Sequence, residues 1–176
     1  DGEVLGKLKS KFVNWLLKDI HLDEIHIGEH SVVVSVAGIK IEEALADDLT
    51  VCGTTCDGTA GENLAQFDVC YLKNDGKYWK ADADAVTSMP VIAMATAAIT
   101  ADASGVFLLL GFVRKDAWAW AMGGLLYADE GTGGTIGGMT QTAPAGAGDQ
   151  VQVIGIAITA DIIYLCPCLE LVEVPA

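Results

Sequence analysis

The chain has 176 residues, of which 52% are hydrophobic and 19% charged, and its formal net charge is −14. This length suits one domain with its own core, and this hydrophobicity argues against disorder. Binding nucleic acid requires clustered Lys and Arg, so the acidic balance excludes it as an expected partner. No stretch approaches the roughly 18 apolar residues of a membrane-spanning helix, so no membrane partner is expected.

Residues 1–22 are predicted to form an amphipathic helix. Apolar residues recur at helical spacing with lysines between them, and they form one narrow stripe of Leu5, Leu8, Phe12 and Trp15. An isolated helix of this length is marginal in water, so the stripe has to dock. It can dock on the chain's own domain or pack against identical copies around a symmetry axis. These four residues are candidates for an attachment or oligomer interface.

Residues 23–60 are predicted to hold short strands and then a polar connection. β-Branched residues up to Ile41 are interrupted by Gly28 and Gly38, a pattern typical of strands joined by turns. Residues 42–63 are polar, acidic and rich in Gly and Thr, and we predict a loop or a lightly structured connection there.

Residues 61–176 are predicted to form a β-rich domain. Asn74-Asp75-Gly76 lies between two apolar-aromatic runs and predicts a tight hairpin. Strands at regular spacing with turn signals between them indicate an antiparallel barrel or sandwich. The predicted strands cover residues 67–73, 77–81, 91–99, 105–113, 124–127, 151–158 and 162–174.

Residues 67–113 and 124–172 resemble each other, which suggests an internal duplication. Asp68-Val-Cys-Tyr71 corresponds to Gly124-Leu-Leu-Tyr127, and Met89-Pro-Val-Ile-Ala-Met-Ala95 corresponds to Val151-Gln-Val-Ile-Gly-Ile-Ala157. The blocks follow in the same order, so we predict two copies of one β unit that complete one core. Chance similarity between strands rich in Val, Ile and Ala is the alternative.

Residues 128–150 are predicted to form a long loop with almost no bulky side chains. They include seven glycines, at 131, 133, 134, 137, 138, 146 and 148. Long loops in compact domains tend to be functional or mobile. One use would be an arm that orders on a neighbouring subunit.

The cysteines do not suggest a redox site. Their number, five, is odd, which favours free thiols in a reducing compartment. A Cys52–Cys56 bridge remains an alternative. Cys166 and Cys168 flank a proline in a strand-like context and lack redox-pair spacing, so core packing is expected.

No cluster of polar residues predicts catalysis or a metal site, and no cofactor is expected. His21, His26 and His30 match no ligand spacing, and surface positions are favoured. Paired carboxylates at Asp82/Asp84 and Asp129/Glu130 could support acid-base chemistry or hold calcium. A solvated face is the preferred interpretation.

Two tryptophans close together in sequence are the remaining candidates. Trp118 and Trp120 would share one face of a strand, and with Trp79 and Tyr78 they could form a sugar-stacking surface. Core or intersubunit packing is the more frequent use of Trp, so Trp118 and Trp120 join the candidate oligomer interface.

Six stretches carry motifs that are patterns of strands and turns rather than catalytic signatures: Asp68-Val-Cys-Tyr-Leu-Lys-Asn-Asp-Gly-Lys-Tyr-Trp-Lys-Ala81, Gly111-Phe-Val-Arg-Lys-Asp-Ala-Trp118, Gly123-Gly-Leu-Leu-Tyr127, Thr140-Gln-Thr-Ala-Pro144, Gly148-Asp-Gln-Val-Gln-Val-Ile-Gly-Ile-Ala157 and Leu169-Glu-Leu-Val-Glu-Val174. Together they resemble a β-rich domain of tailed-bacteriophage virion proteins, which are generally described as head decoration, fibre or tail-associated proteins. The resemblance covers roughly residues 60–174 and transfers no catalytic residue. It implies a virion surface role and a symmetric assembly.

The expected function is therefore a non-enzymatic structural role in a virion, as a capsid decoration (cement) protein or a head or tail fibre component. The expected partners are further copies of the chain, most simply in a homotrimer, and other capsid or tail proteins. The expected location is the virion, assembled in the host cytoplasm. The alternative is a β module that binds a carbohydrate or host receptor, and a host glycan is then the partner.

Overall fold

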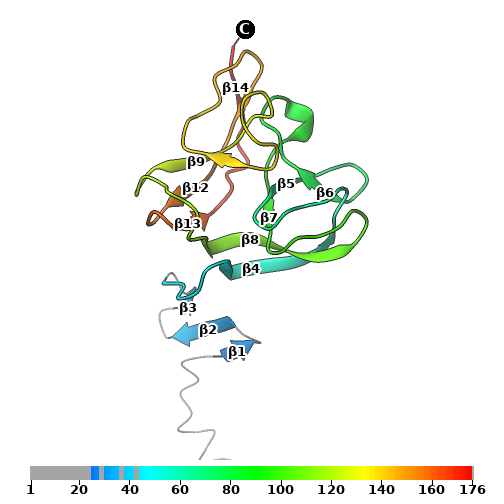
Figure 1. Ribbon diagram of the computed structural model, residues 1–176. Coiled ribbons are helices and arrows are strands. Elements are labelled where there is room, and N and C mark those ends of the chain that lie inside the picture. Colours follow the sequence, from blue (N-terminus) through cyan, green and yellow to red (C-terminus); the bar gives the residue numbers. More distant parts are fainter. Residues whose placement is uncertain (1–24, 28–29, 36–37, 42–43, 176) are drawn as a thin grey trace, which may run out of the picture. The chain divides into compact units, whose positions relative to one another are not determined.

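The computed structural model describes residues 25–27, 30–35, 38–41 and 44–175. The chain divides into two compact units between Ile41 and Glu42, and Figure 1 shows their strands. The predicted helix over residues 1–22 lies outside the described residues, as do its interface candidates Leu5, Leu8, Phe12 and Trp15. Those assignments stay predictions.

The first unit contains a three-stranded antiparallel sheet. Its strands are β1 (Ile25–Ile27), β2 (His30–Ser35) and β3 (Gly38–Lys40), in the order β1-β2-β3. The register pairs Ile27 with His30 and Ser35 with Gly38. The short strands predicted for this segment are confirmed.

The second unit is mainly β and contains one curled antiparallel sheet of nine strands (Figure 1). The sheet order is β10-β9-β12-β13-β8-β7-β5-β6, with β4 paired to β8, while β11 and β14 form a separate pair. One short 3-10 helix, η1 (Val86–Ser88), lies between β6 and β7. The strands are β4 (Thr50–Thr59), β5 (Val69–Leu72), β6 (Tyr78–Lys80), β7 (Ala93–Ala95), β8 (Ser104–Arg114), β9 (Leu125–Ala128), β10 (Met139–Thr140), β11 (Gln150–Val151), β12 (Val153–Ala157), β13 (Ile162–Leu165) and β14 (Val172–Glu173).

The sheet consists of two halves with equivalent strand orders, which meet at the β8–β13 pair. On one side lie β8, β7, β5 and β6, and on the other lie β13, β12, β9 and β10. In chain order the strands are β5, β6, β7 and β8 in one half and β9, β10, β12 and β13 in the other. In each half the first of these strands pairs with the second and third, and the third pairs with the fourth, always antiparallel. Both halves therefore have the same topology.

The register of the two halves also agrees with the sequence alignment. Cys70 lies opposite Ala93 in one half, and Leu126 lies opposite Gly155 in the other. Alignment of Tyr71 with Tyr127, and of Ala95 with Ala157, makes these pairs equivalent. The next pair, Val69 with Met94, matches Leu125 with Ile156 in the same way. Because a slip of one residue would exchange the two faces of a strand, this agreement is a demanding test of the alignment.

The hairpin predicted at Asn74-Asp75-Gly76 is confirmed between β5 and β6. Gly76 has a φ of 77°, and its N–H donates to Lys73 O at 2.9 Å. Lys73 N donates to Lys77 O at 3.0 Å and closes the turn. Glycine adopts this left-handed conformation without a steric penalty.

Two sequence-based expectations about strands are wrong. Residues 42–63 were expected to be a loop or a lightly structured connection, but β4 is a ten-residue strand within them. Its Thr, Val and Cys side chains have good β propensity, and β8 supplies a complete pairing partner. The strand expected over residues 162–174 ends at Leu165, because Pro167 has no N–H to donate.

Residues 128–150 are tied to their own unit rather than extended away from it. Val69 N donates to Gly137 O at 2.8 Å, and Gly137 N donates to Ala81 O at 2.7 Å. Ala83 N donates to Asp129 O at 3.1 Å. These bonds connect the two far ends of the curled sheet through the glycine-rich loop. The loop is thus a structural connection within the unit, which does not fit a free arm.

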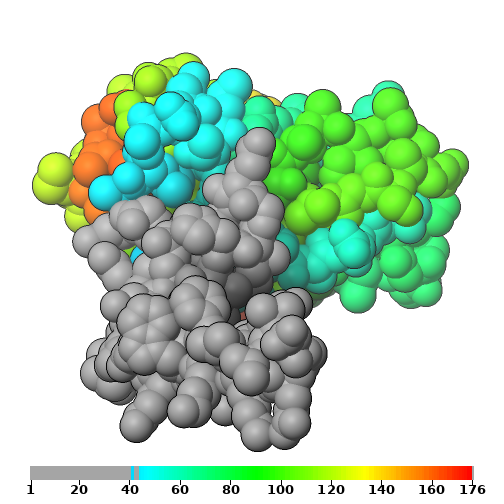
Figure 2. Space-filling model, turned by 90° about the horizontal axis from the view of Figure 1, so that it is seen from below, coloured from blue at the N-terminus to red at the C-terminus, as the bar shows by residue number. Residues whose placement is uncertain are grey.

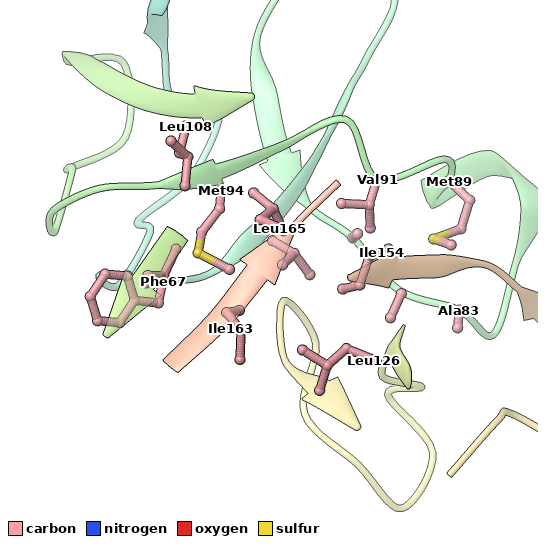
Figure 3. Close-up of a cluster of buried hydrophobic side chains, with 14 residues drawn as sticks. Phe67, Ala83, Met89, Val91, Met94, Leu108, Leu126, Ile154, Ile163 and Leu165 are labelled. Carbon is pink, nitrogen blue, oxygen red and sulfur yellow. The ribbon is translucent and has the colours of Figure 1, made fainter. Parts of the chain in front are cut away.

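The curled sheet surrounds a core of apolar side chains from both halves. Figure 3 shows Met94 and Leu108 of one half pointing toward the same space as Ile163, Leu165 and other residues of the second half. Each of these four side chains has 0% exposure. Since the two halves share this cluster, the burial energy of each depends on the other.

Candidate functional site

Two clusters of side chains in the second unit are candidates for a functional site. One is an aromatic pocket beside the core, and the other is a group of three carboxylates next to the glycine-rich loop.

The aromatic pocket is formed where the chain leaves β8. Trp118 lies with its ring centroid 5.6 Å from that of Phe67 and 5.8 Å from that of Trp120. Both tryptophans are partly buried and pack against the core cluster. The pocket has a volume of about 310 Å³. Its lining residues are Gln66, Phe67, Asp68, Lys115, Trp118, Trp120, Asp129, Thr135, Gly137, Gly138 and Met139.

Backbone hydrogen bonds position the aromatic rings. Trp118 N donates to Lys115 O and Trp120 N donates to Ala160 O, both at 3.0 Å. Phe67 N donates to Ala95 O at 2.8 Å, and Phe67 has a φ of 72°. This left-handed conformation costs on the order of 1–2 kcal/mol in a residue that is not glycine, so packing has to compensate for it.

The polar groups that line the pocket use only part of their hydrogen-bonding and ion-pairing capacity within the protein. Asp68 accepts a hydrogen bond from Ala65 N at 2.7 Å and lies 3.1 Å from Lys80 Nζ. Both carboxylate oxygens of Asp129 accept backbone N–H bonds from its own loop. Lys115 Nζ lies 6.0 Å from the ring centroid of Trp118 and has no ion pair within the described ranges.

The second cluster consists of Asp84, Glu130 and Asp149. One carboxylate oxygen from each lies within 4.8 Å of the other two. Asp149 is only 6% exposed, and its Oδ2 accepts a hydrogen bond from Gly146 N at 2.6 Å. These residues line a pocket of about 340 Å³ together with Thr132 and Gly146. Carboxylate oxygens at this separation could share a hard cation or a proton.

The electrostatics of the cluster favour a protonated carboxyl group. The pKa of Glu130 is raised above its ordinary value, first by a hydrogen bond with Asp149 that requires the protonated form. Desolvation and the like charges of Asp149, Asp84 and Asp129 raise it further.

The cluster also holds the glycine-rich loop in place. Asp84 Oδ2 accepts hydrogen bonds from Thr132 N at 3.0 Å and Thr132 Oγ1 at 2.8 Å. Asp82 Oδ1 accepts one from Gly131 N at 2.9 Å. The expectation that Asp82 and Asp84 lie on a solvated face is therefore wrong, because both are half-buried acceptors for loop N–H groups.

The four aromatic residues considered together in the sequence do not form one surface. Trp118 and Trp120 lie together, although not on a strand. Tyr78 stacks on Phe107 with centroids 4.1 Å apart. Trp79 Nε1 donates to Asp75 Oδ2 at 3.1 Å, and Lys73 Nζ lies 4.1 Å from the Trp79 ring centroid.

Cysteine and histidine positions give mixed results. All five cysteines are free thiols, and burial raises the pKa of Cys70 to about 12, which makes it unreactive. Cys168 is exposed, so core packing was the wrong expectation for it. The side chains of His21, His26 and His30 lie outside the described residues.

Sequence reasoning missed most of the residues that line the aromatic pocket, and in the carboxylate cluster it named Asp84 and Glu130 but missed Asp149. Phe67, Gln66 and Lys115 carry no motif, and they meet Trp118 only because β5, β8 and the loop converge. The partners of Asp84, at positions 130 and 149, lie far along the chain, and no local pattern connects them. No helix in the described part of the chain is long and apolar enough to span a membrane. No family model matches the chain, and neither does any curated protein.

Proposed function

We propose that the chain is a non-enzymatic structural component of a tailed-phage particle that assembles as a symmetric oligomer. The particle is suggested by the resemblance of residues 60–174 to virion domains, and a decoration or fibre position fits it. The assembly is suggested by the outer edge of β4. The partners in this proposal are copies of the chain, in a homotrimer, and other capsid or tail proteins. Its location is the virion, after assembly in the host cytoplasm.

The observation that carries the assembly proposal is the length of the β4 edge. β4 pairs with β8 from Thr50↔Arg114 to Thr59↔Ser104. Among the described strands, none pairs with its other edge. Backbone N–H and C=O groups on that edge point away from β8, and such a row is a template for another strand.

The composition of β4 does little to protect this edge. Natural edge strands are usually blunted by lysine, proline or short length. β4 has ten residues, contains neither lysine nor proline, and carries one charge, at Asp57. A register shift between Thr54 and Thr55 is its only irregularity. Figure 2 shows cyan atoms from the region around the start of β4 at the surface of this unit.

An apolar side chain lies at the start of the same edge. Leu49, directly before β4, is 47% exposed. Strand addition here would reduce this exposure and satisfy backbone groups at the same time.

The number of subunits depends on what β4 meets. Two β4 edges that pair with one another form an isologous contact and close a two-fold dimer. A homotrimer requires β4 to pair with a different surface of the next copy, in a heterologous contact. The measured mass therefore distinguishes the two arrangements.

The test compares two variants that add the same charge. Thr55→Lys places lysine on the exposed part of β4, and Thr87→Lys places it on exposed η1. We expect a trimer by light scattering coupled to size-exclusion chromatography, and dissociation of Thr55→Lys at concentrations at which Thr87→Lys remains assembled. An unchanged thermal transition would show that both variants are folded.

A second measurement tests the particle itself. Particles banded in a density gradient from the organism that carries the gene should contain the chain, detected by mass spectrometry. A chain that is monomeric at every concentration, or that never bands with particles, would rule out this proposal.

A further inference from the structure

We propose that the pocket lined by Phe67, Trp118 and Trp120 is a carbohydrate site that binds one neutral pyranose ring. This inference goes beyond the assembly role, because an assembled subunit and an isolated one would both have the site. The sequence alone placed the two tryptophans in a candidate interface, and that prediction remains open to the test below.

The aromatic rings offer the apolar surface that a sugar ring requires. The three rings are neighbours, with centroid distances of 5.6 Å and 5.8 Å, and the interplanar angles are 49° and 53°. Tilted rings form a corner rather than a flat plate. The C–H face of a pyranose can lie on one ring while its edge contacts the next, and both contacts remove apolar surface from water.

The polar groups complement hydroxyl groups. Lys115 Nζ is a donor with no ion pair in the described part of the chain. Gln66 Nε2 donates to Leu49 O and Thr96 O, which leaves its carbonyl oxygen as an acceptor at the pocket. Asp68 and Asp129 retain lone pairs beyond the bonds they already accept. A hydroxyl group both donates and accepts hydrogen bonds, so the hydroxyl groups of a sugar can pair with the donors and the acceptors of the pocket.

The charge of the pocket favours a neutral ligand. Two carboxylates and one ammonium group line it, and the chain carries a net charge of −14. An anionic sugar would gain one attraction at Lys115 and meet repulsion from Asp68, Asp129 and the overall field.

The size and rigidity of the pocket favour one ring over a peptide segment. Its volume of about 310 Å³ is near the lower end of the range for small-molecule sites, about 300–1,000 Å³. Phe67, Trp118 and Trp120 are fixed by backbone hydrogen bonds and by packing on the core. A site that is already ordered loses little conformational entropy when a ligand binds.

The experiment titrates the full chain with a panel of methyl pyranosides: glucoside, galactoside, mannoside, N-acetylglucosaminide and glucuronide. Saturation-transfer NMR detects weak binding, and calorimetry measures the affinity. We expect binding of at least one neutral pyranoside, weaker binding of the glucuronide, and a loss of affinity of about tenfold or more in Trp118→Ala. Trp79→Ala is the matched control, since Trp79 is also half-buried but does not line the pocket.

Lys115→Gln provides a variant that does not remove a core contact. It should weaken binding with an unchanged thermal transition, so the proposal stays testable if Trp118→Ala does not fold. Absence of binding across the panel by folded protein would overturn the proposal. The proposal would also be overturned if Trp118→Ala and Lys115→Gln lost self-association without a change in sugar binding. The pocket would then be an interface between copies of the chain. Because this readout is sugar affinity and that for β4 is mass, the two proposals fail separately.

Discussion

At the scale of single residues, Glu130 is the most informative group. Its raised pKa means that the folded protein binds a proton more tightly than the unfolded chain does. A group of this kind makes stability fall as pH rises, beginning near its ordinary value of 4.5 and continuing to its higher folded value. Above that window the repulsion among Glu130, Asp149 and Asp84 is fully present.

Glu130→Gln should therefore stabilise the fold at neutral pH. The Gln amide is uncharged and can donate to Asp149, as the protonated Glu130 does. We expect a higher melting temperature than wild type at pH 7 and little difference near pH 4, measured by circular dichroism. Glu170→Gln removes an exposed carboxylate outside the cluster and serves as the control. Equal shifts in both variants would contradict the local origin of the effect.

A second feature of a single residue is a hydrogen-bond donor without an acceptor. Trp120 Nε1 is the one buried side-chain nitrogen or oxygen that lacks a hydrogen-bond partner in the described part of the chain. Such a group usually costs about 1–3 kcal/mol. No sequence pattern distinguishes it from a tryptophan with a partner, because the partner would come from elsewhere in the fold.

At the scale of elements, the β4–β8 pair depends on two glycines that face each other. A Cβ at Gly53 would lie 2.6 Å from Gly111 Cα and even closer to Leu110 O, and these are backbone atoms that cannot move aside. Cross-strand partners without side chains thus let the two strands approach at this point.

Gly53→Ala should destabilise the second unit by roughly 2–3 kcal/mol or more, because the added methyl group forces β4 away from β8. Urea unfolding monitored by tryptophan fluorescence would measure this loss. Gly123→Ala is a suitable comparison, since Gly123 has a φ of 76° but no atom near its Cβ position. Gly123→Ala should be destabilised only by the smaller conformational penalty of about 1–2 kcal/mol. A smaller loss of stability in Gly53→Ala than in Gly123→Ala would contradict the close approach of β4 and β8.

Some elements could be predicted from local residue patterns and others could not. The Asp75-Gly76 turn and the strands around it follow from local residue chemistry, so the hairpin was predictable. β4 was not, since its alternation is weak and its stability comes from β8, about 50 residues further along the chain. Phe67, Gln66 and Lys115 in the pocket were missed for the same reason.

At the scale of the whole molecule, the net charge of −14 opposes assembly. Copies of the chain repel one another, and added salt screens this repulsion. Self-association should therefore strengthen when NaCl is raised from about 50 mM to about 500 mM, over which the Debye length shortens severalfold. Sedimentation equilibrium at both concentrations checks this. Weaker association at high salt would mean that the contacts are ion pairs rather than strand addition and apolar burial.

Residue patterns alone were enough to predict the β character of the second unit, its hairpin, and the alignment of residues 67–113 with 124–172. These features depend on nearest neighbours along the chain, on turn residues and on side-chain alternation. Three features became visible only in the folded chain: β4 joins the sheet, Asp84, Glu130 and Asp149 converge, and two tryptophans share a pocket with Phe67. Such contacts form between distant segments, and their position is set by the packing of both halves around one core.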